Sequence, residues 1–140
     1  MIEVSDRPIA PYSLLSNWHK TLSLGSSGAQ CHFIGTMRDM NLGDAVSEMH
    51  MECYPEMATR EFERLVAQAK RRFGVESALL VHRYGHLMPG DPIVVIAVAT
   101  EHRGEAFDAC RFLIEALKSS APFWKREQTQ ASGSRWVASA

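Results

Sequence analysis

The chain has 140 residues, which is enough for one domain and too few for two. Hydrophobic residues make up 46% and charged residues 22% of the sequence, which excludes a disordered chain, a collagen-like fibre and a coiled-coil rod. The net charge of −1 provides no overall field that would attract nucleic acid or anionic lipid. We therefore expect one domain over residues 1–140, in which any anion site depends on a local cluster of cations.

Several features favour a reduced, cytoplasmic protein. The longest aliphatic run is 93–99, whereas a membrane-spanning helix needs about 20 apolar residues. The N-terminal residues lack the basic and apolar regions of a signal peptide. The cysteines, which form no Cys-x-x-Cys pair and cannot all be bridged within the chain because their number is odd, are Cys31, Cys53 and Cys110.

The first part of the chain predicts one helix and two strands. Residues 11–24 carry apolar side chains at spacings of three and four, which is typical of a short amphipathic helix. Residues 29–37 are expected to form a strand. After a glycine-containing turn, residues 49–53 alternate between apolar and polar side chains, which indicates a strand with one face in water.

The following part predicts two long helices and two further strands. Residues 55–73 form an apolar stripe at helical spacing, with a proline suited to the first turn and a glycine directly after the end. Residues 77–84 predict a strand, and the β-branched residues 93–100 predict a central strand covered on both faces. Residues 105–119 predict the last helix, with five side chains facing inward: Phe107, Cys110, Leu113, Ile114 and Leu117.

This order of elements predicts an α+β fold. Hairpins that alternate with helices argue for antiparallel strands whose helices pack on one face of the sheet. Phe123 and Trp124 are expected to lie in a turn that folds down against the body of the protein. The last residues, about 128–140, are expected to form a loop and a short strand.

His102 and Arg103 stand at a candidate anion site, because a buried strand runs almost directly into the last helix there. The first backbone N–H groups of a helix have no partner within the helix and can bind an anion. Arg103 can add two parallel hydrogen bonds to a phosphate or carboxylate. The alternative is a capping segment with a solvated arginine.

The segment 118–127 is the second candidate, with the sequence Lys-Ser-Ser-Ala-Pro-Phe-Trp-Lys-Arg-Glu. If its aromatic residues pack against the body, Lys125 and Arg126 are held in place. A partly buried lysine loses its proton more readily and can serve as an acid or a base. For Lys118 there is a structural alternative, because a cation near a helix C-terminus is stabilised by about 0.3–1 kcal/mol.

The third candidate is Arg38, which follows the first long strand at the start of a loop. A surface arginine at a strand end is the alternative. His82 and His86 are interpreted as core or surface histidines, because no cysteine or acidic partner completes a zinc site. No metal site is expected.

Several blocks of sequence form a specific pattern when they are taken together: 33–38 (Phe-Ile-Gly-Thr-Met-Arg), 41–43, 51–57, 82–85, 89–91, His102-Arg103, 118–127 and 135–137. This pattern resembles the catalytic (large) subunit of molybdopterin synthase. The resemblance extends over about residues 29–137, and Lys-x-x-Ala-Pro-Phe-Trp-Lys is its most specific string.

The resemblance implies a fold, an activity and partners. The fold is an α/β hammerhead with a small additional antiparallel sheet. The activity is sulfur transfer to cyclic pyranopterin monophosphate (precursor Z), in which two sulfurs form the dithiolene of molybdopterin. The sulfur is carried as a thiocarboxylate on the C-terminal Gly-Gly of a small ubiquitin-like carrier subunit. The catalytic subunits form a homodimer at the centre of a heterotetramer, and no cofactor is implied.

The resemblance also implies roles for individual residues. Lys118 and Lys125 match the catalytic lysines of the family, and we assign Lys118 to the carrier's carbonyl and sulfur and Lys125 to acid–base work on the substrate. The residues that match its substrate-binding positions are Thr36, Met37, Arg38, His102, Arg103, Arg126 and Glu127. Thr36 and Met37 depart from the basic residue and valine of many relatives. We expect Arg38, His102, Arg103, Lys118 and Lys125 to converge on one hollow, beside a groove lined by Phe33 and Phe123.

Two other functions compete with this one. The same cluster of arginines and lysines is compatible with a phosphate-recognising enzyme of acyl or nucleotidyl transfer. A catalytically silent scaffold that binds a ubiquitin-like partner is the other alternative, and retention of both lysines argues against it.

Overall fold

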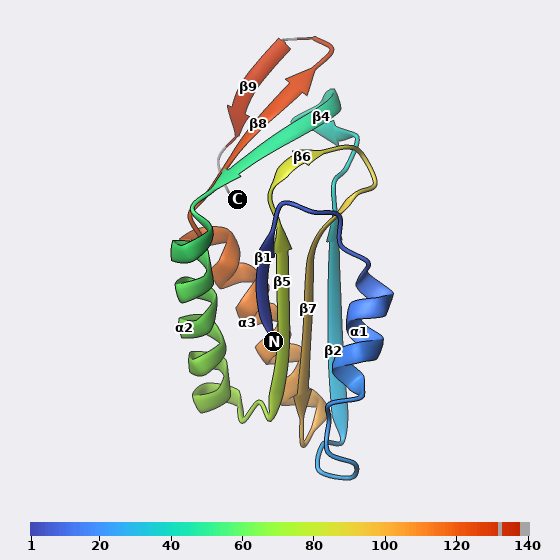
Figure 1. The fold of residues 1–140 in the computed structure, drawn as a ribbon, viewed down its shortest axis with the longest axis vertical. Coiled ribbons are helices and arrows are strands. Elements are labelled where there is room, and N and C mark those ends of the chain that lie inside the picture. Colours follow the sequence, from blue (N-terminus) through green and yellow to red (C-terminus); the bar gives the residue numbers. More distant parts are fainter. Residues whose placement is uncertain (132, 138–140) are drawn as a thin grey trace.

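The computed structural model describes residues 1–131 and 133–137, which form two sheets and three helices (Figure 1). The elements in chain order are β1 (Ile2–Ser5), α1 (Pro11–His19), β2 (Ala29–Thr36), β3 (Met40–Asn41), β4 (Asp44–Cys53), α2 (Pro55–Phe73), β5 (Ser77–Arg83), β6 (Gly85–Leu87), β7 (Pro92–Thr100), α3 (Arg103–Ser120), β8 (Phe123–Thr129) and β9 (Gly133–Val137). The predicted α+β class is confirmed. None of the helices among the described residues is long and apolar enough to cross a membrane.

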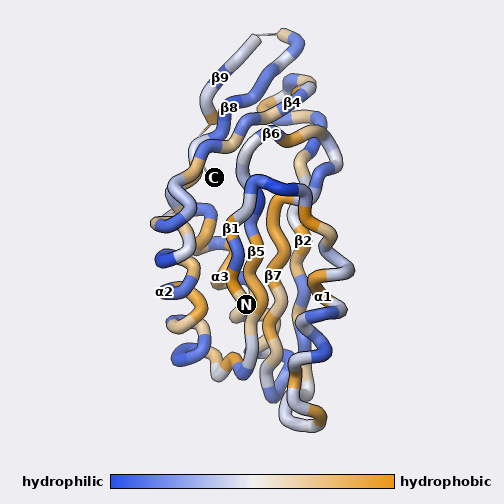
Figure 2. Tube along the Cα trace, in the orientation of Figure 1, coloured by the Kyte–Doolittle hydropathy of each residue, from blue (hydrophilic) through white to orange (hydrophobic). Residues whose placement is uncertain are grey.

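The first sheet has the strand order β1-β5-β7-β2. β7 lies between β5 and β2 and runs antiparallel to both, while β1 pairs with β5 in parallel. The residues from Val94 to Thr100 are all buried, which confirms the prediction of a central strand covered on both faces. Figure 2 shows β5 and β7 as the most hydrophobic strands of the molecule. The core of the protein therefore lies on both sides of this sheet.

The helices divide between the two faces of this sheet (Figure 1). α2 and α3 cover one face, where their apolar side chains pack on Leu80, Ile96 and Val98. α1 covers the other face, where Leu15 and Trp18 pack on alternate residues of β5 and β7. The expectation that all helices share one face is therefore wrong for α1, because both faces of β5 and β7 are apolar and each needs a cover.

The second sheet has the order β3-β4-β8-β9, and it stands at one end of the first sheet (Figure 1). The short strand β6 also belongs to it and pairs with residues 49–51 of β4. This second sheet is the small additional antiparallel sheet that the resemblance implied. Along β4, Met49 and Met51 are buried while Glu48 and Glu52 are exposed, which confirms the predicted alternation. β9 confirms the short C-terminal strand, while residues 132 and 138–140 of the expected loop lie outside the described residues.

Several details differ from the sequence prediction, among them the short strands β3 and β6, which were not predicted, and the start of β4 at Asp44. Residues 123–129 form the strand β8 instead of a turn, because their backbone pairs with β4 on one side and β9 on the other. β1 was not predicted. α1 ends at His19, before the predicted residue 24. Phe107 is 65% exposed, because it lies about 100° around α3 from the buried stripe formed by Ala106, Ala109, Cys110, Leu113 and Leu117.

Candidate functional site

A cavity of about 630 Å³ opens where the C-terminal end of α3 meets the second sheet. This volume lies within the range of roughly 300–1,000 Å³ that is typical of small-molecule sites. Its walls are mainly apolar and include Phe33 and Phe123, the two residues expected to line a groove. Three cationic side chains also line it: Arg38, Lys118 and Lys125. The cavity is therefore suited to a partly apolar ligand that carries negative charge.

The alternation of β8 decides which residues of the segment 123–127 reach the cavity. Phe123, Lys125 and Glu127 all line it, since side chains at every second position of a strand share one face. Arg126 points to the opposite face, where its guanidinium carbon lies 5.8 Å from the centre of the Trp136 ring. Of the predicted site residues in this segment, Lys125 and Glu127 reach the cavity and Arg126 does not.

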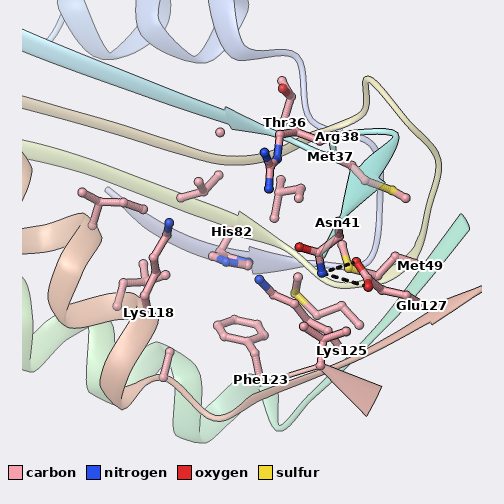
Figure 3. Close-up of a pocket in the computed structure, with 18 of the residues that line it drawn as sticks. Thr36, Met37, Arg38, Asn41, Met49, His82, Lys118, Phe123, Lys125 and Glu127 are labelled. Atoms are coloured by element: carbon pink, nitrogen blue, oxygen red, sulfur yellow. Dashed lines mark hydrogen bonds between the residues drawn. The ribbon is translucent and has the colours of Figure 1, made fainter. Parts of the chain in front are cut away.

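Lys118 enters the cavity from the last turn of α3. The helix ends at Ser120 because Ala121 is extended and Pro122 cannot continue it. After this short turn the chain continues along the cavity as β8, so Lys118 from α3 and Lys125 from β8 reach the same cavity (Figure 3). Their predicted convergence is present in the structure.

Lys125 has an environment that favours loss of its proton. Partial burial lowers the pKa of Lys125 below its ordinary value, and the nearby ammonium group of Lys118 lowers it further. The carboxylate of Glu127 acts in the opposite direction. A lysine whose pKa is lowered gives up its proton more readily, which is a requirement for acid–base chemistry near neutral pH.

Glu127 is buried and held by two partners (Figure 3 shows the first). The Nδ2 atom of Asn41 donates to its two carboxylate oxygens at 2.9 and 3.1 Å. The Nε atom of Arg135 donates to Oε1 at 3.3 Å, and the same guanidinium donates to Asp44 at 2.7 Å and to the carbonyl of Asn41 at 2.9 Å. This network joins β8 and β9 to the β3–β4 turn and fixes one wall of the cavity.

The segment that follows β2 forms the opposite wall. The backbone N–H of Met37 donates to Asp91 at 2.9 Å, and its carbonyl accepts from Gly90 at 2.8 Å. Thr36 and Met37 line the cavity beside Arg38. Arg38 is exposed, and no carboxylate in the described part of the chain pairs with it. Its guanidinium is therefore available to an anionic ligand.

His102 and Arg103 lie at the other end of α3 and do not line the cavity. Lys118 comes fifteen residues after Arg103, which corresponds to about 22 Å along a helix axis. The side chains of His102 and Arg103 are exposed, and the Nε2 atom of His102 lies 3.5 Å from a carboxylate oxygen of Glu101. Within one chain, three of the five expected residues converge and these two do not.

His82 is a cavity residue to which sequence analysis assigned no function. It is buried at the end of β5, as expected of a core histidine, and it also lines the cavity. Burial lowers the pKa of His82 to about 4, a hydrogen bond to the Arg83 carbonyl opposes this shift, and the charge of Lys125 adds to it. The sequence could have placed His82 on the inner face of β5, because side chains at every second position share a face and His82 follows Ala78 and Leu80, which both pack in the main core.

The donor chemistry of the cavity is that of an anion site. Among the described residues, no three side chains of His, Cys, Asp or Glu lie close enough together to hold a metal ion. The cavity is lined by two ammonium groups and a guanidinium, together with the rings of His82 and Phe123. Such an arrangement can bind an anionic group and stabilise negative charge that develops during a reaction.

Comparison with known proteins gives a consistent result. The model of the MoaE protein family matches residues 5–120. A molybdopterin synthase catalytic subunit of Ralstonia nicotianae is 54% identical over 110 residues, which are 79% of this chain and 62% of that protein. The chain thus spans less than two thirds of that relative. The protein of the same name from Pasteurella multocida is 43% identical over 99% of this chain and 89% of its own length.

Solved structures show the same fold. Molybdopterin synthase from Staphylococcus aureus has a TM-score of 0.84 at 29% identity and covers 96% of this chain and 95% of its own. A complex of subunits 1 and 2 of molybdopterin-converting factor from Helicobacter pylori has a TM-score of 0.77, covers 94% and 87%, and at 20% identity supports the fold alone. The family model, the relatives and the fold agree, and the chain belongs to the MoaE protein family.

Proposed function

We propose that the chain is the catalytic subunit of a molybdopterin synthase. It transfers two sulfurs from the C-terminal thiocarboxylate of a small ubiquitin-like carrier subunit to cyclic pyranopterin monophosphate and so forms the molybdopterin dithiolene. The observation that carries this proposal is the convergence of Arg38, Lys118 and Lys125 on one cavity with apolar walls. The shared name of the relatives, molybdopterin synthase catalytic subunit, supports it.

The cavity matches the substrate in two respects. Its apolar walls, which include Phe33 and Met51, suit the flat pterin ring system. Arg38 suits the cyclic phosphate, because a guanidinium can donate two parallel hydrogen bonds to phosphate oxygens. Thr36 and Met37 lie beside Arg38 and contact the same ligand in this proposal.

Each sulfur transfer consists of two steps. The thiocarboxylate sulfur attacks a side-chain carbon of the pterin, a C–S bond forms, and the C–O bond at that carbon breaks as a proton is delivered to the oxygen leaving group. Water then hydrolyses the acyl–sulfur bond, which leaves a thiol on the substrate and a carboxylate on the carrier. The hydrolysis builds negative charge on the carbonyl oxygen of the carrier.

The two lysines divide these steps. Lys118 stabilises the carbonyl oxygen, a contribution of about 2.7–4 kcal/mol for a preorganised donor. Lys125 delivers the proton to the leaving oxygen and takes one from water, since its lowered pKa makes proton transfer easier than for an ordinary lysine. Glu127, held by Asn41 and Arg135, contacts the substrate from the neighbouring wall.

The proposal includes two kinds of partner. The carrier must present an extended C-terminal tail to Lys118, and the name of the relatives, molybdopterin synthase catalytic subunit, supports the presence of a further subunit. His102 and Arg103 lie at the far end of α3 and can contact the same substrate only from a second copy of the chain, which the homodimer at the centre of a heterotetramer supplies. Arg126, on the face of β8 away from the cavity, can likewise contact substrate only across such an assembly.

Reconstitution tests the proposal. The purified chain is mixed with a thiocarboxylated carrier and cyclic pyranopterin monophosphate, and molybdopterin is measured as its fluorescent oxidation product. We expect one dithiolene for every two carriers consumed. A stable complex with the carrier but no product would support the silent scaffold instead. Thermal stabilisation by nucleotides or coenzyme A, but not by the pterin, would support the acyl or nucleotidyl transferase.

A further inference from the structure

His82 is the polar side chain of the cavity for which the proposed chemistry gives no role. Only 5% of the residue is exposed, yet it lines the cavity together with both lysines. Its ring is stacked on Phe123, with centroids 4.1 Å apart and planes inclined by 19°, and Phe62 lies 6.0 Å from it. The aromatic contacts fix the orientation of the imidazole.

The hydrogen bond of this ring defines which nitrogen carries the proton. Nδ1 of His82 lies 2.8 Å from the carbonyl oxygen of Arg83, and a carbonyl can only accept. Nδ1 therefore bears the hydrogen. Since the pKa of about 4 keeps the ring neutral at pH 7, Nε2 has a free lone pair. No described residue donates a hydrogen bond to Nε2 within bonding distance.

The lysines stand close to this acceptor. His82, Lys118 and Lys125 line the same cavity, and the charge of Lys125 lowers the pKa of His82. Figure 3 shows the His82 ring between the amino groups of Lys118 and Lys125. A neutral imidazole can orient an ammonium group without the large rise in pKa that a carboxylate at the same place would cause.

We propose that His82 is a positioning residue for Lys125: rotation of the flexible lysine side chain brings its amino group to Nε2 of His82, to which it donates a hydrogen bond, and this contact holds the amino group at the reacting carbon. This inference rests on the proposed function for its effect on rate. Its structural part concerns only the contact between the two side chains and can be measured without turnover.

Three variants separate the features of the imidazole. His82→Gln keeps a polar atom near the place of Nε2, His82→Asn keeps one near Nδ1 only, and His82→Phe keeps the stacking on Phe123 without either nitrogen. We expect kcat to fall on the order of 10²-fold in the Asn and Phe variants, because a displacement of about 1 Å has that effect. KM for the pterin should change little, and the Gln variant should recover most of the lost kcat.

The comparison among variants remains decisive if one of them is unstable. Melting temperatures identify any variant that does not fold, and a folded Gln variant is then compared with the wild type and with whichever of the other two folds. Recovery of kcat by Gln supports the proposal. A folded Gln variant that is as slow as Asn or Phe, or full activity in Asn or Phe, overturns it.

A spectroscopic measurement tests the contact itself. In protein labelled with 15N-histidine, we expect His82 to show a protonated Nδ1 and an unprotonated Nε2, and the Nε2 resonance should move in Lys125→Met and not in the surface control Lys20→Met. An Nε2 resonance that is unchanged in Lys125→Met overturns the proposal. This result does not depend on turnover, so failure of the wild-type chain to form molybdopterin would contradict the proposed function separately.

Discussion

Replacement of Arg135 by alanine should strongly destabilise the protein, because Arg135 is a main partner of a buried carboxylate. The Glu127 side chain is 9% exposed, and Arg135 bonds to it, to Asp44 and to the carbonyl of Asn41. Loss of one partner of a buried ion pair costs about 3–5 kcal/mol, and a single hydrogen bond to a charged group contributes about 1.5–3 kcal/mol. Asn41 still donates to Glu127, and the Arg135 side chain is 22% exposed, so that water replaces part of the loss.

We therefore expect the free energy of unfolding to fall by about 2–3 kcal/mol in Arg135→Ala. For a chain of 140 residues the unfolding entropy is about 0.3 kcal/mol/K, so the melting temperature should fall by roughly 7–10 °C. Urea and thermal denaturation followed by circular dichroism measure both quantities. The matched control is Arg111→Ala, whose exposed partner Glu115 lies 3.6 Å away, and it should cost less than about 0.5 kcal/mol.

A second substitution identifies the cause of the loss. If an uncompensated buried charge destabilises Arg135→Ala, then adding Glu127→Gln should restore at least about 1 kcal/mol, because a neutral amide is less costly to bury. An Arg135→Ala protein as stable as the Arg111→Ala control would refute this reasoning. So would a double variant that is no more stable than Arg135→Ala alone.

Three further predictions concern titration and packing. Burial holds the pKa of His82 at about 4, below its unfolded value of 6.5, so the unfolded chain binds the proton first as the pH falls. Between about pH 6.5 and pH 4, the free energy of unfolding should therefore decrease by up to roughly 3 kcal/mol more in the wild type than in His82→Phe. Urea denaturation at each pH measures this difference. Lys118→Met should raise the pKa of Lys125 only part of the way to its ordinary value, measured by NMR of the lysine side chains, because burial is the larger cause of the shift. Gly28→Ala should destabilise the protein by about 1–3 kcal/mol in thermal denaturation, because its Cβ would overlap the carbonyl oxygen of Glu101.

Each of these three has an outcome that contradicts it. Parallel pH profiles for the wild type and His82→Phe would show that His82 is not held neutral by the fold. A pKa of Lys125 that does not change in Lys118→Met would place the two ammonium groups too far apart to share a site. For glycine, the control is Gly104→Ala, where no atom lies within 4 Å of the added Cβ and φ is not positive; equal losses at both positions would refute the steric argument.

Local patterns were sufficient to predict the elements whose own residues determine them. The period of α2 and the alternation of β4 follow from which side chains are apolar; α2 has the predicted bounds, and β4 contains the predicted residues 49–53 but begins earlier, at Asp44. β8 was missed because Trp124, Lys125 and Arg126 have no strand pattern of their own. Their strand exists because β4 and β9 supply hydrogen-bonding partners from both sides, and such distant pairing is not encoded in the local sequence.

The site was predictable to a different extent. Composition and spacing identified Arg38, Lys118 and Lys125 only as separate candidate residues, and the resemblance alone predicted that they form one site. The proximity of these side chains depends on the turn after α3 and on the pairing of β8, both of which are tertiary features. His82 was interpreted as a core or surface histidine because no further ligand completed a zinc site, and its stacking on Phe123 and its place in the cavity are known only from the structure.

A lysine scan in the reconstituted reaction tests the role of the cavity most directly, because the chain contains only four lysines. Lys118 and Lys125 line the cavity, whereas Lys20 and Lys70 are exposed elsewhere and serve as internal controls. Each is replaced by alanine, and single-turnover formation of molybdopterin is measured at saturating carrier and pterin. We predict losses of at least about 10²-fold for the two cavity lysines and wild-type rates for the two controls. Wild-type rates in Lys118→Ala and Lys125→Ala would show that the chemistry takes place elsewhere.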